Sequence, residues 1–498
     1  MKKRDSKNSN SNIRVREIRL DTENQEVSTD RGRNTELVIV TYVFGFLFLL
    51  LAGYLIYLNV AKRDEINSNV YNTKQDTRTD AVIRGSIVTE EGAVLAVTNV
   101  DENGSESRYY PYANVFAHVI GYANNGKAGL EAAANKDLLG SHSSFVSQLS
   151  GEYSNEKSQG DTVVVTLDPT LQQAAYNALG TYKGAVVVLE PGSGKILAMV
   201  SKPDFDPNTI SQEWERMVTD ESNSALLNRA TQGLYPPGST FKILTALAYL
   251  RENNGNYENF FFDCTGTLME ENVTITCYNQ NVHGREDLKS AFAHSCNTAF
   301  AHIGLDLDCG EFKKLAEKFL FNTSLPTQLP HSESMFKLNR DSSYGEIMTT
   351  SIGQGDTLVT PLHMALITSA VSKGGVLMKP YCVARVENSD GDTVSEAKPS
   401  IYGKLMTPEE AGILTSFMKE TVSSGTAVEL SYSAYSAAGK TGSAEYETDG
   451  VTGTHSWFVG FSNVDDPDIV VAVIAEDGGT GSQTAVPIAR AIFDAYYY

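Results

Sequence analysis

The chain is poor in cysteine and in positive charge. Five cysteines in 498 residues exclude a disulfide scaffold, and their odd number leaves at least one thiol unpaired. Lys and Arg number 40 against 61 Asp and Glu, so the formal net charge of −21 excludes a general electrostatic attraction to nucleic acid. The sequence has neither a Gly-x-Ser-x-Gly turn nor a His-Glu-x-x-His helix, and its eight histidines are scattered. We therefore expect no metal and no cofactor.

Long hydrophobic runs are also rare, with one exception. The overall composition, 41% hydrophobic and 20% charged, is that of a globular protein, and at about 150 residues per domain the length predicts two or three domains. Residues 37–60, however, contain no charge. As a helix rising about 1.5 Å per residue, this run is long enough to cross a bilayer, and it has no polar face. It begins too late in the chain for a signal peptide, so we expect an uncleaved transmembrane anchor.

The anchor separates a short tail from the rest of the chain. Residues 1–36 are polar, without apolar periodicity, and are expected to be disordered. They hold nine Lys and Arg against seven Asp and Glu, while Lys62 and Arg63 follow the anchor. The positive-inside rule favours a cytoplasmic N-terminus in a cell membrane, with the acidic remainder outside the cytoplasm.

Residues 61–157 predict a small, β-rich, non-catalytic domain close to the membrane. Two β-like runs, 81–88 and 93–97, surround a turn at Glu91-Gly92 and indicate a hairpin. A helical segment follows at 129–131. Residues 141–160 are rich in Ser, Gly and Asn, which is typical of a linker.

Residues 158–498 predict an α+β domain. Strands are expected at 162–167, 185–189 and 196–200, with Asp168 capping a helix between the first two. About 200 helix-prone residues follow, and strands return at 456–461 and 469–475 before a last helix from about 484. This order predicts an antiparallel sheet that is split in sequence and has a helical insert.

Three short motifs carry the candidate chemistry. In the first, Ser239 and Lys242 are three apart at the start of a helix and share one face, so the lysine amine is placed to activate the hydroxyl. We expect burial and the positive charge of Lys440, in the third motif, to lower the pKa of Lys242 and keep its amine neutral. In the second, Ser295 and Asn297 both face a pocket if Cys296 points into the protein. Each motif alone is weak, because a capped helix or an ordinary turn has the same pattern.

The third motif is Lys440-Thr441-Gly442-Ser443 on a predicted strand. Lys440 and Gly442 are expected to point the same way, and the missing side chain of Gly442 leaves room for a substrate along the strand.

Together the motifs read Ser-x-x-Lys, Ser-x-Asn and Lys-Thr-Gly, in that order, and resemble the signature of penicillin-binding protein transpeptidases. The resemblance covers nearly everything from residue 81 onward. Further matching segments lie at 228–230, 235–242, 353–355 and 455–461. Arg84-Gly85-x-Ile87 and Gly129-Leu130-Glu131 are similar to class B members in particular. Thr89-Glu90 departs from the Asp-Arg that is frequent there, which bears on subfamily rather than chemistry.

The resemblance implies catalytic roles. Ser239 attacks the penultimate D-Ala carbonyl of a peptidoglycan stem peptide, and Lys242 accepts the serine proton. Ser295 and Asn297 relay protons and hold the donor peptide, while Lys440 adds positive potential. The backbone N–H groups of Ser239 and Ser443 form the oxyanion hole.

It also implies the binding partners. Thr441 and Lys440, next to Gly442 and Ser443, recognise the terminal carboxylate of the donor peptide or of a β-lactam. An amine from a second stem peptide then resolves the acyl-enzyme. A membrane glycosyltransferase of wall synthesis is the expected protein partner.

Several alternatives share these motifs. A D,D-carboxypeptidase differs only in using water, and a β-lactam sensor uses the same fold but carries several membrane spans. A class A β-lactamase needs a deacylating Glu where Met335 stands, and a bifunctional enzyme needs more than the about 100 residues between anchor and catalytic domain. Residues 434–441 nearly match a phosphate-binding loop.

The sequence leaves the state of two cysteines open. Cys264 and Cys277 flank a strand-like segment, and either a disulfide outside the cell or two separate buried thiols fits it. Cys296 is expected to point inward, and His294 and His455 are expected to be structural.

Overall fold

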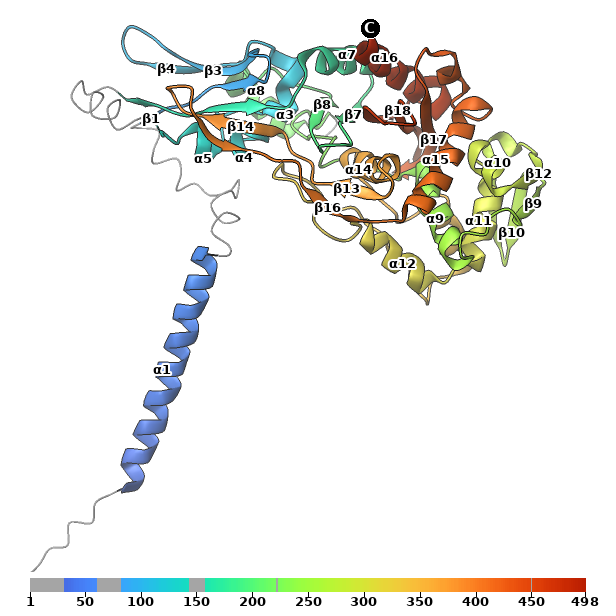
Figure 1. The fold of residues 1–498 in the computed structure, drawn as a ribbon, viewed down its shortest axis with the longest axis horizontal. Helices are drawn as coiled ribbons and strands as arrows, with labels where there is room; N and C mark the ends of the chain where they lie inside the picture. Colours follow the sequence, from blue (N-terminus) through green and yellow to red (C-terminus); the bar gives the residue numbers. More distant parts are fainter. Residues whose placement is uncertain (1–30, 61–81, 143–156, 221–222, 449) are drawn as a thin grey trace, which may run out of the picture. The chain divides into compact units, whose positions relative to one another are not determined.

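The computed structural model describes residues 31–60, 82–142, 157–220, 223–448 and 450–498 (Figure 1). The chain divides into two compact units, Met1–Glu65 and Ile66–Tyr498, which are described separately. The predicted disordered tail falls largely on residues 1–30, outside the described residues. The basic pair after the anchor and most of the predicted linker, at 61–81 and 143–156, fall outside them as well.

In the first unit the described residues form helix α1 (Arg31–Val60), which begins six residues before the predicted anchor. Its segment Leu37–Leu58 is the one helix among the described residues that is long and apolar enough to cross a membrane. Large side chains such as Leu37, Phe44 and Phe48 are 64–72% exposed. A helix that is apolar all round needs an apolar solvent, which agrees with a membrane anchor.

The second unit contains a six-stranded sheet that crosses the predicted domain boundary at residue 157. The expected hairpin is present, because β2 (Ile87–Thr89) pairs antiparallel with β3 (Val94–Val100). However, β2 also pairs parallel with β6 (Thr162–Val165), which lies beyond residue 157, and β6 pairs with β14 (Val383–Glu387) from much later in the chain. A boundary at 157 therefore stays a prediction. In order across the sheet the strands are β15 (Thr393–Glu396), β14 (Val383–Glu387), β6 (Thr162–Val165), β2 (Ile87–Thr89), β3 (Val94–Val100) and β4 (Glu106–Tyr109).

A buried cluster of charged side chains connects the segment that begins at Arg84 with the segment 129–131, the two segments that resemble class B members. Nε of Arg84 lies 2.6 Å from one carboxylate oxygen of Glu131, and Nε of Arg108 lies 2.7 Å from the other. Burial alone would raise the pKa of Glu131, but the two guanidinium groups hold it below its usual value. Glu131 lies on α4 (Gly129–Ala133), as the sequence predicted. The two segments that resemble class B members are thus held together by a buried ion pair between Arg84 and Glu131.

A five-stranded antiparallel sheet forms the centre of the rest, in the order β17-β18-β19-β7-β8. The strands β7 and β8 end at Lys202 and the strands β17 to β19 begin at Ala437, so the sheet is split in sequence as predicted. The predicted cap is also present, since Asp168 accepts hydrogen bonds from two backbone N–H groups at the start of α7 (Pro169–Leu179). The strands are β7 (Gly184–Leu189), β8 (Ile196–Lys202), β17 (Ala437–Thr448), β18 (Val451–Ser462) and β19 (Val470–Ala475).

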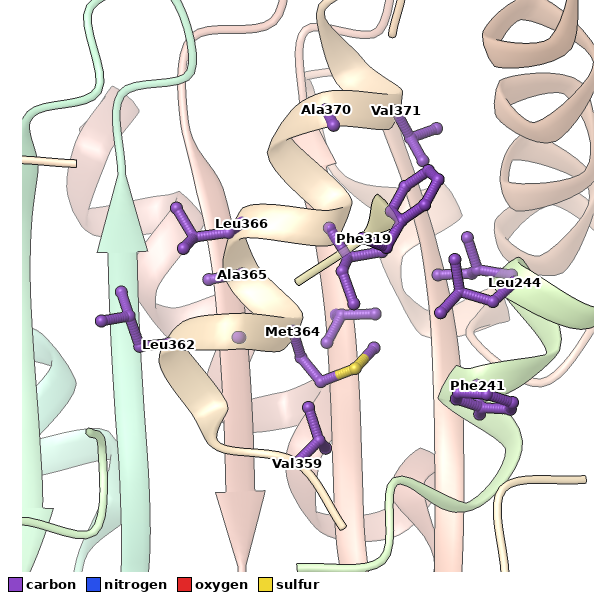
Figure 2. Close-up of a cluster of buried hydrophobic side chains, with 14 of the residues drawn as sticks. Phe241, Leu244, Phe319, Val359, Leu362, Met364, Ala365, Leu366, Ala370 and Val371 are labelled. Carbon is purple, nitrogen blue, oxygen red and sulfur yellow. The ribbon is translucent and has the colours of Figure 1, made fainter. Parts of the chain in front are cut away.

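Alternate residues of this sheet enter two different cores. Val186 and Val188 pack with α7 (Pro169–Leu179) and α16 (Val486–Tyr497), whereas Val187 belongs to the larger core on the other face. There, α14 (Pro361–Ser372) is buried from Pro361 to Val371. Figure 2 shows its side chains clustered with Phe241 and Leu244, which come from the segment of the first motif.

The helical insert contains more strand than the sequence predicted. The helices are α8 (Ile210–Thr219), α9 (Lys242–Glu252), α10 (Leu288–Ala293), α11 (Asn297–Asp306), α12 (Cys309–Lys318), α13 (Tyr344–Ser351), α14 and α15 (Pro408–Ser423). Between them lie β9 (Phe261–Cys264), β10 (Thr267–Glu270), β11 (Val273–Thr276), β12 (Gly284–Asp287), β13 (Val376–Met378) and β16 (Ile401–Lys404). The shorter elements are β1 (Val82–Ile83), α3 (Ala117–Ile120), α5 (Asn135–Leu138) and β5 (Ser158–Gln159).

Candidate active site

The first motif sits on a tight turn that leads into a buried helix. A 3₁₀ turn, Gly238–Phe241, precedes α9, and Ser239 lies in this turn. The N–H of Gly238 donates to the carbonyl of Gly353 at 2.8 Å, which fixes the turn from outside. Nζ of Lys242 lies 3.1 Å from Oγ of Ser239. The predicted shared face of the two residues is therefore present.

Ser295 and Asn297 of the second motif contact the same amine, that of Lys242. Nζ of Lys242 lies 2.8 Å from the Ser295 carbonyl oxygen, 3.4 Å from its Oγ and 2.8 Å from Oδ1 of Asn297. Ser295 has φ 60° between α10 and α11, a left-handed conformation that is uncommon for residues other than glycine. Cys296 is fully buried, as predicted, so Ser295 and Asn297 both line the cleft.

The third motif lies on β17, at the edge of the five-stranded sheet. The hydroxyls of Thr441 and Thr426 are 2.5 Å apart, and Oγ of Ser443 accepts a 3.3 Å hydrogen bond from the Gly481 N–H. Since Lys440 and Thr441 lie inside a strand with no helix after them, the phosphate-binding-loop alternative is wrong.

Two expectations for this strand need correction. Lys440 is fully buried, and its Nζ donates to the Thr441 carbonyl at 3.1 Å instead of lining the cleft. Gly442 does not make room for a substrate, because a Cβ there would lie 3.1 Å from the Pro237 carbonyl oxygen and 3.1 Å from the Thr240 methyl carbon. The missing side chain instead lets the turn that carries Ser239 approach the strand. The motif alone does not reveal which face of the strand is packed against the rest of the protein, and this decides whether a side chain such as that of Lys440 is buried or lines the cleft.

Burial lowers the pKa of both Lys242 and Lys440. Burial lowers the pKa of Lys242 to about 8. Burial and the neighbouring Lys242 ammonium hold the pKa of Lys440 well below its ordinary value. The expected direction for Lys242 is thus confirmed, but with a pKa of about 8 its ammonium is still the major form at pH 7, and the neutral base predominates only above pH 8.

The three motifs open onto a single cleft of about 800 Å³. Ser239, Ser295, Asn297, Thr441 and Ser443 line it. Most of the other residues that line the cleft were not predicted from the sequence: Thr274 to Asn281, Thr349, Ile352, Gln354, Thr426, Glu445 and Thr480 to Gln483. Gln354 alone had a signal, because it lies within the Gly-Gln-Gly segment that resembled the family.

His294 and His455, which were expected to be structural, each contact a neighbouring side chain. His294 also lines the cleft, and its Nδ1 lies 2.8 Å from a Glu286 carboxylate oxygen. His455 stacks on Tyr446, with ring centroids 4.4 Å apart.

Comparisons with known proteins agree with this geometry. Residues 184–494 match the penicillin binding protein transpeptidase domain, and residues 84–163 match the penicillin binding protein A dimerisation domain. A peptidoglycan D,D-transpeptidase PbpA from Mycolicibacterium smegmatis is 32% identical over 93% of this chain and 99% of its own length. The PbpA of Mycobacterium tuberculosis is 34% identical over 78% of this chain and 84% of its own length.

Solved structures are similar over the same region. The ceftriaxone acyl-enzyme complex of penicillin-binding protein A from Mycobacterium tuberculosis has a TM-score of 0.77 at 30% identity, covering 84% of this chain and 99% of that one. A D,D-transpeptidase domain from Eggerthella lenta has a TM-score of 0.76 at 32% identity, covering 84% of this chain and 98% of that one.

Proposed function

The chain belongs to the penicillin-binding protein transpeptidase family as a class B member, and on that premise we propose how its residues perform the reaction. It is a membrane-anchored serine D,D-transpeptidase of peptidoglycan synthesis and is covalently inhibited by β-lactams. The observation that supports the residue roles is the contact of one buried amine, that of Lys242, with Ser239, Ser295 and Asn297.

Acylation begins with proton transfer from Ser239 to Lys242. Oγ of Ser239 then attacks the penultimate D-Ala carbonyl carbon of the donor stem peptide, and the peptide C–N bond breaks. The leaving D-Ala amine takes a proton from Lys242 through the Ser295 hydroxyl, 3.4 Å from Nζ. Asn297 holds the amine of Lys242 in place through its Oδ1. The backbone N–H groups of Ser239 and Ser443 stabilise the oxyanion.

The donor peptide is bound along the free edge of β17. An edge strand offers unpaired backbone groups to an extended peptide. The hydroxyl of Thr441 faces the cleft and binds the terminal carboxylate, which a β-lactam carboxylate mimics. Lys440, buried behind Thr441, acts on this site through its interaction with the Thr441 carbonyl and not by direct contact. An amine from a second stem peptide finally attacks the acyl carbon and releases Ser239.

The acyl-enzyme is expected to be long-lived with β-lactams. Met335, at the place of the deacylating Glu of class A β-lactamases, pairs with Leu358 in a β-bridge and does not line the cleft. This placement favours a transpeptidase over a β-lactamase.

We assign an extracytoplasmic catalytic unit and a cytoplasmic N-terminus to the membrane-anchored chain. The charge distribution on either side of residues 37–60 supports this orientation. The substrate chemistry also implies a partner that supplies glycan strands, namely a membrane glycosyltransferase.

The whole chain in detergent, incubated with a fluorescent penicillin, tests the assignment. We expect covalent labelling with slow release in the wild type, none in Ser239→Ala, and wild-type labelling in the control Ser431→Ala, an exposed serine outside the cleft. Labelling that survives in Ser239→Ala contradicts the proposed nucleophile. Assay with stem peptides and an amine acceptor separates cross-linking from carboxypeptidase hydrolysis.

A further inference from the structure

Gln354 lies beside the edge of β17, and the mechanism above gives it no role. Its side chain is half-buried and lines the cleft. With its amide oriented to satisfy both groups, the nitrogen donates to the Glu445 carbonyl at 3.0 Å and the oxygen accepts a hydrogen bond from the Glu445 N–H at 3.1 Å. An amide that makes both bonds to one residue reproduces the pairing of a neighbouring β-strand. We propose that Gln354 closes the free edge of β17 at Glu445 and thereby limits how much of the donor peptide pairs with this strand.

The backbone around Gln354 is held in place on its own. Gly353 and Gly355, on either side of it, have φ 76° and 69°, a conformation that favours glycine. The N–H of Gln354 donates to the carbonyl of Thr349 at 2.9 Å, which ties the segment to α13. The side chain therefore reaches β17 from a backbone that is already hydrogen-bonded, so pairing with Glu445 needs little further ordering.

Glu445 lies two residues after Ser443 on β17, and this spacing decides which backbone groups are open. The N–H and carbonyl of an antiparallel strand face the same neighbour at every second residue. Those of Glu445 face the free edge, because Gln354 binds both, so those of Ser443 face it as well. The Ser443 carbonyl does face the turn that carries the nucleophile, since a Cβ on Gly238 would lie 3.1 Å from its oxygen. Ser443 is therefore the neighbouring position on this edge at which a donor can pair.

The direction of the donor peptide, which rests on the proposed function, shows what Gln354 excludes. With its carboxylate at Thr441 and its penultimate carbonyl at the Ser443 N–H, the donor runs antiparallel to β17. Paired residues of antiparallel strands exchange both hydrogen bonds, so the penultimate D-Ala also donates its N–H to the Ser443 carbonyl. The next such pair would join Glu445 to the donor residue two positions before the penultimate D-Ala.

Gln354 already occupies the place of that donor residue. Its amide makes the two hydrogen bonds to Glu445 that the donor backbone would otherwise make. The donor therefore leaves the edge of β17 after a single hydrogen-bonded pair. Gln354 is thus a specificity-determining residue, which confines strand recognition to the D-Ala-D-Ala end of the donor and makes it indifferent to the backbone further upstream.

N-methylated donors test the proposal in the wild-type protein. The probes are synthetic peptides with three residues before D-Ala-D-Ala, and release of D-Ala by the whole chain in detergent gives kcat/KM. A methyl group on the nitrogen of the penultimate D-Ala removes one hydrogen bond and is expected to lower kcat/KM by at least about 2-fold. The same change two residues earlier is expected to leave kcat/KM at its original value, because Gln354 and not the donor pairs with Glu445. An equal loss at both positions overturns the proposal.

Removal of the Gln354 side chain is expected to open the edge. In Gln354→Ala the long donor can pair with Glu445, whereas an N-acetylated donor with one residue before D-Ala-D-Ala lacks the N–H for this pair. The ratio of kcat/KM for the long donor to kcat/KM for the short donor is therefore expected to rise by about 2- to 12-fold over the wild type, the worth of one hydrogen bond. Gln173→Ala, which removes an exposed amide of α7 outside the cleft, keeps the wild-type ratio.

The ratio separates this role from a structural one. If Gln354 only supports the fold, Gln354→Ala lowers kcat/KM for both donors alike and the ratio stays unchanged, which overturns the proposal. The N-methylated donors decide the question in the wild type if Gln354→Ala fails to fold. Penicillin labelling of Ser239, followed in parallel, shows separately whether the proposed function holds, because it needs no donor backbone at Glu445.

Discussion

Nζ of Lys242 lies 3.1 Å from Oγ of Ser239, and the lysine is completely buried. A hydroxyl and an amine at this distance exchange a proton without further movement. Because burial disfavours the ammonium form, the amine retains its base function near physiological pH.

Replacing the base is expected to abolish most of the activity. Lys242→Ala leaves Ser239 without a proton acceptor, so the rate constant for penicillin acylation falls by about 10²–10⁴-fold. Stopped-flow or gel-based labelling with a fluorescent penicillin measures it. The control Lys314→Ala removes an exposed lysine that does not line the cleft and keeps the wild-type rate. Wild-type acylation by Lys242→Ala would refute the assigned base.

The rate of acylation is also expected to rise with pH. The base works in its neutral form, and the pKa of Lys242 is about 8, so the rate rises about tenfold per pH unit well below 8 and levels off above it. The acylation rate constant measured from pH 6 to 9.5 at constant ionic strength gives the profile. A flat profile, or one that falls as the pH rises through 8, contradicts a lysine base.

The buried carboxylate of Glu131 is predicted to stabilise the folded protein. Glu131→Gln leaves the almost fully buried guanidinium groups of Arg84 and Arg108 without a counter-charge, so the free energy of unfolding falls by about 3–5 kcal/mol. Denaturant titration followed by tryptophan fluorescence measures the loss. Glu311→Gln, which breaks an exposed pair with Lys314, serves as the control and changes stability by less than about 1 kcal/mol. Equal stability of the two variants would mean that the cluster carries no net stabilisation.

Local signals accounted for much of the fold. The Asp168 cap, the β7–β8 pair around its Gly-containing turn and the β2–β3 hairpin all depend on residues close together in sequence. The motifs predicted the Ser239–Lys242 contact because helical spacing alone brings the two side chains together.

Features that depend on distant packing were not predictable in the same way. The strand-like segment between Cys264 and Cys277 forms β10 and β11, but β9 and β12 are four residues each and do not alternate apolar and polar residues, so the sequence did not predict them. The contact of Cys296 with Cys277 and the burial of Lys440 arise only once separate segments fold together. The parallel β2–β6 pairing likewise joins segments that the sequence assigned to different domains.

The glycine that faces the nucleophile turn allows a test of how closely Ser239 must be placed. Gly353 has φ 76°, and a Cβ there would lie 2.1 Å from the Gly238 carbonyl oxygen and 2.7 Å from Cβ of Phe241. Gly353→Ala must therefore displace the turn that holds Ser239, and because a shift of about 1 Å in a reacting group costs about 10²-fold, acylation should fall by that order. Gly412→Ala on α15 is the matched control: nothing lies within 4 Å of its added methyl, so it stabilises the helix by about 1 kcal/mol and leaves acylation unchanged. Wild-type acylation by a folded Gly353→Ala would show that the turn tolerates displacement and that the Gly238–Gly353 hydrogen bond does not position the nucleophile.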